Sequence, residues 1–417
     1  MTENKEKKHL GFSKLGISNS ILSVLDKLNL DTPTPIQSKS IPVAIAGQDL
    51  IGLAQTGTGK TFAFGIPMIQ RLAEVKGRAL VLLPTRELAL QVDENIRKLG
   101  NSLGLKTAAL IGGEAIGKQM FALRRNPHVL IATPGRLSDC IRRKIVKLEN
   151  VKILVLDEAD LMFDMGFAPQ IEEILKYLPK ERQTMLFSAT MPPAILKLVA
   201  VHMHLPVSIE VAPSGTTVEK VDQEVFVMHS EDKPIYLEKV LKKYEGSVLV
   251  FTRTKYGARQ MAKVARAAGH QAAEIHSNLS LRQRREALDG FKSRKYRILF
   301  ATDIAARGLD VNGIELVVNY DLPDNCEDYV HRIGRTGRAG NKGRAITFAT
   351  PRQWRDVQKI ERLIKKNLTL TKYAEPVQFQ DNNQHSKRPN RSRFSSPRSQ
   401  NSYRGRNRNF RPGRKRK

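Results

Sequence analysis

Short apolar runs separated by longer helical stretches occur in two successive blocks along this chain. In the first block, residues 50–54, 79–83, 129–132, 153–156 and 184–187 have the length and apolar character of buried strands. Helical stretches such as 87–99 and 171–178 lie between them. Short buried strands that alternate with helices are typical of βα units, so this block predicts a parallel sheet.

The same alternation returns in the second block. Strands are predicted at 247–251, 272–275, 298–301, 316–319 and 345–349, with helices such as 257–268 and 281–293. A polar segment with Pro213 and Gly215, residues 212–219, separates the blocks and is predicted to be a linker. The predicted fold class is therefore α/β, with two tandem parallel-sheet domains at residues 1–211 and 220–373. Ligands of such open sheets bind at the carboxyl ends of the strands.

The last segment, residues 374–417, differs in composition from both blocks. From residue 381 onward it has thirteen lysines and arginines against one acidic residue, Asp381, and few apolar residues that could form a core. Phe394, Tyr403 and Phe410 are interleaved with the arginines. Basic and aromatic residues together suit single-stranded nucleic acid, through phosphate attraction and base stacking. We therefore predict a disordered, nucleic-acid-binding tail, with a purely solubilising tail as the alternative.

The whole chain is strongly basic, with 70 Lys+Arg against 41 Asp+Glu and a formal net charge of +29. This excess favours polyanionic partners, either nucleic acid or an anionic membrane face. No stretch approaches about 18 consecutive apolar residues, so no membrane span or membrane partner is expected. The charged first ten residues argue against a secretory signal. Cys140 and Cys326 lack metal-ligand spacing and predict two buried thiols in a reducing, cytoplasmic setting.

A glycine-rich loop, AQTGTGKT at residues 54–61, follows an apolar run and precedes a helical one. Gly57 and Gly59 allow backbone N–H groups to turn toward phosphate oxygens. Lys60 supplies a positive charge to the β- and γ-phosphates, and the hydroxyl of Thr61 is a ligand for Mg²⁺. A glycine-rich connection without any ligand is the alternative.

A second motif, DEAD at residues 157–160, follows the predicted strand 153–156. Asp157 lies at the strand end and can hold Mg²⁺ directly or through water, because this ion prefers oxygen ligands. Glu158 can orient and deprotonate an attacking water. Together with the glycine-rich loop these acids predict a nucleotide-hydrolysing site, with a solvated helix start as the alternative.

The order of these and further motifs resembles the DEAD-box family of ATP-dependent RNA helicases. The first domain has Phe12, TPIQ at 34–37, the loop at 54–61, PTREL at 84–88, GG at 112–113, TPGR at 133–136, DEAD and SAT at 188–190. The second domain has VFTR at 250–253, ATDIAARGLD at 301–310 and HRIGRTGR at 331–338. The resemblance extends from Phe12 to about residue 373, looks most like the bacterial RhlE-type branch, and implies two RecA-like domains.

The resemblance implies a nucleotide site with residues from both domains. Gln37 would read adenine and Phe12 would stack on its ring, so that the fuel is ATP. The other implied contacts to ATP and Mg²⁺ come from the loop and the ribose-binding aspartate: Gln55, Thr56, Gly57, Thr58, Gly59, Lys60, Thr61 and Asp310. The implied catalytic set comprises Lys60, Asp157, Glu158 and two arginine fingers, Arg335 and Arg338.

Spacing alone makes a further prediction for the second domain. Arg332, Arg335 and Arg338 are three residues apart and would share roughly one face of a helix. From such a face they could clamp the γ-phosphate held by the first domain. A basic surface stripe for RNA phosphates remains the alternative for Arg332.

RNA contacts carry over from the resemblance to both domains, namely to Thr85, Arg86, Gly113, Thr133, Gly135, Arg136, Arg253 and Thr302. Loops of this kind bind phosphates without reading sequence. Ser188 and Thr190 match the motif that couples hydrolysis to strand separation. Two positions depart from the family pattern: Leu161 follows DEAD where many members have arginine, and Ser277 stands where a glycine is usual.

The implied function is local unwinding or remodelling of RNA duplexes and ribonucleoproteins, driven by closure of the two domains on ATP and RNA. Expected partners are single-stranded RNA and short duplexes, bound largely independently of sequence, in ribosomal precursors or the RNA-decay machinery. Two alternatives remain open. A DNA translocase would not need the pair Gln37 and Phe12. An RNA annealing or clamping protein acting mainly through its tail would not need an intact Lys60, Glu158 and Arg335.

Overall fold

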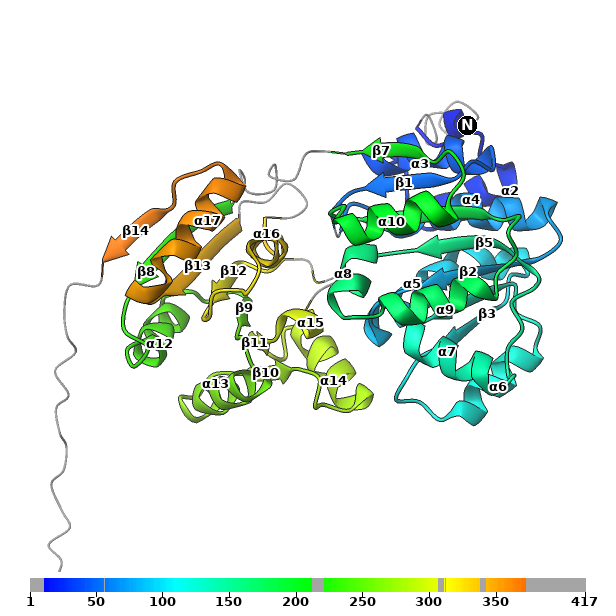
Figure 1. Ribbon diagram of the computed structural model, residues 1–417. Helices are drawn as coiled ribbons and strands as arrows, with labels where there is room; N and C mark the ends of the chain where they lie inside the picture. Colours follow the sequence, from blue (N-terminus) through cyan, green and yellow to red (C-terminus); the bar gives the residue numbers. More distant parts are fainter. Residues whose placement is uncertain are drawn as a thin grey trace, which may run out of the picture. The chain divides into compact units, whose positions relative to one another are not determined.

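The computed structural model describes residues 11–55, 57–211, 221–306, 311, 313–337 and 343–372 (Figure 1). The predicted linker 212–219 and the predicted tail 374–417 lie outside the described residues. The same is true of three predicted site residues: Thr56, Asp310 and Arg338.

The first block forms a seven-stranded sheet in which all neighbouring strands are parallel, as predicted. In spatial order the strands are β3 (Thr107–Leu110), β4 (Val129–Ala132), β2 (Arg78–Leu82), β5 (Val151–Leu156), β6 (Gln183–Ser188), β1 (Leu50–Leu53) and β7 (Val207–Glu210). The five predicted strands are all present. The two edge strands, β3 and β7, were missed because β3 is buried only at alternate residues and β7 only at Ile209, so neither is a continuous apolar run.

Helices cover both faces of this sheet, and alternate strand residues pack against them. In β5, Ile153 and Val155 face one core, whereas Leu154 and Leu156 face the other. The first core is covered by η2 (Ser13–Leu15), α2 (Asn19–Lys27), α3 (Pro35–Ile45), α4 (Lys60–Glu74) and α5 (Arg86–Gly100). The second is covered by α7 (Pro134–Arg142), α8 (Ala159–Asp164), α9 (Ala168–Lys176) and α10 (Pro193–His202). The short η3 (Asn101–Leu103) and α6 (Ile116–Arg124) flank β3.

The second block repeats this topology strand for strand. Its parallel sheet has the order β10 (Ala272–Ile275), β11 (Ile298–Ala301), β9 (Val248–Phe251), β12 (Leu316–Asn319), β13 (Gly343–Ala349), β8 (Val221–Val227) and β14 (Thr369–Lys372). Counted within its own block, each strand takes the same place as its counterpart in the first sheet. The two domains are therefore copies of one fold, and β8 and β14 are the strands that the sequence did not reveal.

Helices also cover both faces of the second sheet. One core lies under α14 (Leu281–Lys292), α15 (Asp303–Ala306), α16 (Cys326–Ile333) and α17 (Trp354–Ile364), which follows η4 (Pro351–Gln353). The other lies under α12 (Lys233–Lys243) and α13 (Lys255–Ala267). Both sheets thus present the carboxyl ends of their central strands as loops, which is where the predicted site residues occur.

The cysteine prediction holds for only one of the two thiols. Cys140 is buried in the first domain, but Cys326 is partly exposed because it is the first residue of α16. Both are free. Among the described residues, no helix has the length and apolar character needed to cross a membrane.

Candidate nucleotide and RNA site

The glycine-rich loop connects β1 to α4 and positions a helix N-terminus for an anion. Gly57 and Gly59 have φ values of 87° and 91°, which are strained for any residue with a side chain. Gly59 is the N-cap of α4, and Lys60 is its first residue. Unpaired N–H groups at this helix start, together with the helix dipole, favour phosphate binding.

Gln37 connects the TPIQ motif to this loop. Its Oε1 accepts a hydrogen bond from the backbone N–H of Thr34 at 2.9 Å, and its Nε2 donates to the carbonyl oxygen of Gly59 at 3.1 Å. An amide has two donor hydrogens and two acceptor lone pairs, so one donor and one acceptor are left over. One donor and one acceptor are what the N7 and exocyclic amine of adenine require. The geometry is compatible with the predicted adenine contact.

The Phe12 side chain is more buried than the adenine-stacking role implied by the resemblance requires. Its side chain belongs to the core beside α2 and α3 and is only 1% exposed. Almost none of the ring is available to an adenine in this arrangement. Stacking of Phe12 on the nucleotide stays a prediction, and it requires the segment around η2 to move.

The carboxyl end of β5 brings two acids against the loop lysine. Lys60 Nζ lies 2.8 Å from Glu158 Oε1 and 4.0 Å from Asp157 Oδ1, and all three side chains are buried. Burial raises the pKa of Asp157 to about 7, Glu158 adds to the rise, and Lys60 opposes it. Burial alone would lower the pKa of Lys60, but the charges of Glu158 and Asp157 outweigh it and raise that pKa. The triad is thus a compact, solvent-poor charge cluster.

Glu158 itself has an unusual backbone conformation. Its φ of 53° and ψ of 51° are left-handed, and it is the N-cap of α8. A non-glycine residue rarely adopts this region unless its surroundings require it. In this conformation the Glu158 carboxylate lies 2.8 Å from Lys60 Nζ.

Asp160 joins the DEAD and SAT motifs. Its Oδ2 accepts hydrogen bonds from the backbone N–H groups of Ala189 and Thr190 and from the Thr190 hydroxyl, at 3.0–3.1 Å. Its own backbone N–H donates to Ser188 Oγ at 3.2 Å. Ser188 and Thr190, predicted as the coupling residues, therefore both contact the acidic motif directly.

Arg332 and Arg335 do not share a helical face, so the prediction is wrong for this pair; Arg338 lies outside the described residues. The helix α16 ends at Ile333, and Arg335 lies in the turn that follows. Arg335 is buried, and its Nε donates to the carbonyl oxygen of His331 at 3.3 Å. Regular spacing in sequence was mistaken for helical spacing because Gly334 ends the helix between the first two arginines.

Arg332 is also not part of a basic surface stripe. It is 1% exposed and forms a two-pronged ion pair with Asp303. Its guanidinium also donates to Asn319 Oδ1 and to the carbonyl oxygen of Asp321, and it stacks on the Phe251 ring at 5.0 Å. These contacts join the ATDIAARGLD and HRIGRTGR motifs within the second domain. We therefore call Arg332 an anchor, meaning a buried residue that holds these two motifs together.

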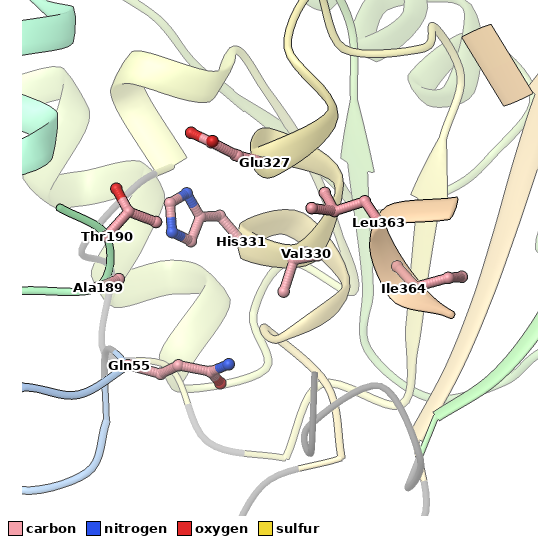
Figure 2. Close-up of a pocket in the computed structure, with 8 residues that line it drawn as sticks. All are labelled: Gln55, Ala189, Thr190, Glu327, Val330, His331, Leu363 and Ile364. Carbon is pink, nitrogen blue, oxygen red and sulfur yellow. The ribbon is translucent and has the colours of Figure 1, made fainter. Parts of the chain in front are cut away.

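His331, which the sequence analysis did not single out, faces the coupling motif (Figure 2). A cavity of about 120 Å³ is lined by Gln55, Ala189 and Thr190 from the first domain and by Glu327, Val330, His331, Leu363 and Ile364 from α16 and α17. The His331 ring points from α16 toward Thr190. A histidine of the HRIGRTGR motif therefore shares a cavity with the SAT motif, which the spacing of the arginines could not reveal.

The predicted RNA contacts of the first domain gather in one hollow of about 470 Å³. Its walls include Thr85, Arg86, Thr133, Gly135 and Arg136, together with Gly112 next to the predicted Gly113. Thr85 and Thr133 are the N-caps of α5 and α7, so two helix N-termini face this space. Backbone N–H groups at helix starts bind phosphate without reading bases.

Gly113 and Arg86 are in direct contact. Gly113 has a φ of 76°, and a Cβ added there would collide with the Arg86 guanidinium. On the far side of the hollow, Arg136 donates to Gln119 Oε1 at 2.8 Å, and Gln119 Nε2 donates to the carbonyl oxygen of Ile111 at 2.7 Å. The GG turn, both arginines and α6 therefore form one connected assembly.

The second domain contributes to the same hollow through Ser277, Arg284 and Ile304. None of these was a predicted contact, although Ser277 was noted as a departure from the family pattern. Thr302 follows β11 and lies next to Ile275, since its backbone N–H donates to the Ile275 carbonyl at 3.4 Å. The Arg284 Nη2 forms an ion pair with Glu87 Oε2 at 2.9 Å. Nothing in the sequence indicated that Arg284 and Glu87 would form an ion pair.

Arg253 lies apart from that hollow. Its guanidinium donates to the carbonyl oxygen of Leu322 at 3.2 Å and lies 3.3 Å from Asp324. It lines a different pocket, between the loop at 322–325 and α17. RNA binding by Arg253 stays a prediction and requires its side chain to turn away from this loop. Leu161, the other departure from the family pattern, is buried and makes no surface contact.

Comparison with known proteins identifies both halves of the chain. Residues 34–198 match the DEAD/DEAH box helicase family, and residues 232–340 match the helicase conserved C-terminal domain. The chain is 43% identical over 360 residues to the ATP-dependent RNA helicase CshA of Listeria monocytogenes, covering 86% of this chain and 69% of that protein. It is 41% identical over 361 residues to the DEAD-box ATP-dependent RNA helicase RhpA of Helicobacter pylori, covering 86% and 73%.

Solved structures share the architecture of both domains. S. cerevisiae Dbp5 bound to RNA and ADP BeF3 matches with a TM-score of 0.79 at 29% identity, covering 87% of this chain and 95% of that one. Mss116p bound to ssRNA and AMP-PNP matches with a TM-score of 0.81 at 26% identity, covering 88% and 79%. The likeness spans both sheets and therefore extends beyond a single nucleotide-binding domain.

Proposed function

This chain belongs to the DEAD-box family of ATP-dependent RNA helicases, and from that premise we propose that it separates short RNA duplexes locally through ATP-driven closure of its two domains. The observation that carries the proposal is the set of hydrogen bonds from Asp160 to Ser188, Ala189 and Thr190. Asp160 belongs to the same motif as the hydrolytic acids Asp157 and Glu158. Ala189 and Thr190 share a cavity with His331 of the second domain.

The charge cluster at the loop supports a specific role for each group. Lys60 neutralises Glu158 in this structure, at 2.8 Å. The phosphates of ATP would compete for the Lys60 ammonium, because a polyphosphate offers several anionic oxygens at the helix start. Release from Lys60 leaves Glu158 as the general base that takes a proton from the attacking water.

The donor set also fits Mg²⁺. Asp157 is a buried carboxylate whose raised pKa reflects poor solvation, so a bound cation would stabilise its ionised form. No cluster of three or more His, Cys, Asp or Glu positioned as a metal site exists among the described residues. Mg²⁺ suits such a sparse site, since it binds one or two protein oxygens, here Asp157 and Thr61, together with phosphates and water. When bound, the ion would neutralise charge on the transferred phosphoryl group.

The positions of the remaining described residues support the roles proposed for them. Arg86, Arg136 and the N-termini of α5 and α7 would hold the RNA backbone, which gives binding that is largely independent of sequence. Arg335 would approach the γ-phosphate on closure and exchange its contact with the His331 carbonyl for that anion. Arg338 and Asp310 would complete the site, as the resemblance implies.

The proposed setting is the cytoplasm, with RNA in ribosomal precursors or the RNA-decay machinery as candidate substrates. Membership of the bacterial RhlE-type branch is part of this proposal. The basic composition of residues 374–417 supports a role in RNA affinity rather than in the chemistry of hydrolysis.

A strand-displacement experiment tests this function. With ATP and Mg²⁺, the full chain should separate a short RNA duplex, and it should fail on a duplex several times as long because closure acts on only a few base pairs. The Glu158→Gln variant should still bind RNA and ATP, but it should neither hydrolyse ATP nor separate the duplex. Equal separation of both duplexes would indicate tracking along the strand and would contradict the proposal. Separation without ATP would favour an annealing or clamping protein.

A further inference from the structure

A hollow of about 260 Å³ lies beside β3, at the edge of the first sheet, and shares no lining residue with the RNA hollow. Figure 1 shows the position of β3 and α6. It is lined by residues from α5, the segment after it, β3 and α6, namely Arg97, Asn101, Leu105, Lys106, Thr107, Phe121, Ala122 and Arg125. We call this the α6 hollow. No acidic side chain of the described residues lines it, whereas three basic ones do.

Phe121 is the most unusual residue of the α6 hollow. Its ring is 66% exposed although most large apolar side chains of this domain are buried. Lys118, Phe121 and Arg125 are spaced at i, i+3 and i+7, so they follow one face along α6 and its C-cap. An exposed aromatic ring between two cations is the combination that single-stranded nucleic acid binds, through stacking and phosphate attraction.

One of the three basic residues of the α6 hollow, Arg97, is already paired with an acid. Asp93 lies 2.9 Å from the Arg97 guanidinium and accepts a hydrogen bond from the Thr107 hydroxyl at 2.5 Å. The positive charge available to a ligand therefore comes from the other two. Lys106 and Arg125 remain exposed on the rim, where they can attract an anion.

The helix α6 contacts both the α6 hollow and the proposed RNA cleft, through different side chains. It begins three residues after Gly113, which lies against Arg86 of the cleft. Its buried Gln119 accepts a hydrogen bond from Arg136 of the cleft. Phe121 is five residues beyond Ile116, the first residue of α6, which is roughly 7.5 Å along the helix axis. A strand that leaves the cleft at the start of α6 would have to follow this short length of helix to reach the ring.

We propose that the exposed face of α6 and the α6 hollow form a second RNA-binding surface, which holds single-stranded RNA that continues out of the main cleft. A base stacks on Phe121, and flanking phosphates lie against Lys118, Arg125 and Lys106. This inference rests on the proposed function, since RNA must first occupy the cleft. The chain's own basic tail is a poor occupant of this surface because both carry positive charge.

Fluorescence-anisotropy titrations of the full chain test the surface directly. Two single-stranded RNAs are compared, one of about 6 nucleotides that fills the cleft alone and one of about 15 that extends beyond it at both ends. Phe121→Ala should weaken binding of the long RNA about five- to tenfold and leave the short RNA unchanged. Arg125→Gln should reduce the salt dependence of long-RNA binding by about 0.7 in the log–log slope.

Matched controls on the same domain separate this surface from general effects. Tyr177→Ala removes an aromatic ring that is 52% exposed at the C-cap of α9, and Lys197→Gln removes one exposed charge from α10. Both controls should bind the two RNAs as the unaltered chain does. Photo-crosslinking of the long RNA should also yield a peptide that contains Phe121, and the short RNA should not.

Three results would overturn the inference. Phe121→Ala could lower the affinity for both RNAs equally, or lower the affinity for neither. Alternatively, a poly-glutamate peptide could bind in a manner that depends on Phe121 while long RNA does not, which would make the surface a protein-docking site. Failure of the proposed function is distinguishable, because the unaltered chain would then show no ATP hydrolysis stimulated by the short RNA.

Discussion

Replacement of Arg332 tests whether this buried residue is an anchor of the second domain or an RNA ligand. In Arg332→Gln, the shorter neutral side chain cannot reach both Asp303 oxygens, the Asp321 carbonyl and the Phe251 ring. Breaking a buried ion pair costs about 3–5 kcal/mol, because the remaining charge loses its partner. The Asp303 side chain is 23% exposed and partly regains water, which favours the lower end, about 3 kcal/mol.

A loss of about 3 kcal/mol should lower the unfolding temperature of a domain of this size by about 6–12 °C. Hydrogen exchange in increasing urea would assign the loss to peptides of β9, α15, β12 and α16, which carry the contacts of Arg332. The control Arg355→Gln, at an exposed position on α17, should change stability by less than about 0.5 kcal/mol. Unchanged stability together with a smaller salt dependence of RNA binding would refute the anchor role and restore the surface-contact interpretation.

Three further substitutions have distinct expected outcomes. Gly113→Ala places a side chain at a φ of 76° against Arg86, so RNA affinity by anisotropy should fall at least tenfold with ATP affinity unchanged; equal RNA affinity would contradict the contact. Gln37→Ala removes the amide held at Gly59, so the preference for ATP over GTP should fall by about 1–3 kcal/mol in competition binding, and an unchanged preference would exclude adenine reading by this residue. Asp160→Asn replaces the acceptor of several hydrogen bonds with a poorer one, so the amount of duplex separated per ATP hydrolysed should fall. An equal proportional loss in the rates of duplex separation and of ATP hydrolysis would argue against coupling.

The central strands and the phosphate loop were predictable from the sequence because their physical requirements are local. A strand such as β4 is buried on both faces and therefore appears as a continuous apolar run. The loop requires glycine where φ is positive, as at Gly57 and Gly59. The strands β3, β7 and β8 were missed because exposed or half-buried residues interrupt each of them. The edge strand β14 was missed because its short sequence TLTK contains only one apolar residue.

The side-chain partners could not be predicted from spacing. Arg332 and Arg335 differ by three positions, yet the helix ends between them, so one is an anchor and the other lies in a turn. Phe12 occupies the core although the resemblance gives it an exposed role. His331 and Arg284 acquire neighbours from the first domain that lie more than a hundred residues away along the chain. Long-range contacts of this kind arise from the fold and leave no local pattern.

ATP hydrolysis measured with single-stranded RNA, with single-stranded DNA and without nucleic acid tests the central claim most directly. Asp160 joins the hydrolytic acids to the SAT motif, which adjoins His331 of the second domain, so closure of the domains on RNA should stimulate hydrolysis strongly. Glu158→Gln should abolish hydrolysis while ATP and RNA still bind. Stimulation by RNA and little by DNA would agree with a DEAD-box RNA helicase that uses these residues. Equal stimulation by DNA, or full activity in Glu158→Gln, would contradict it.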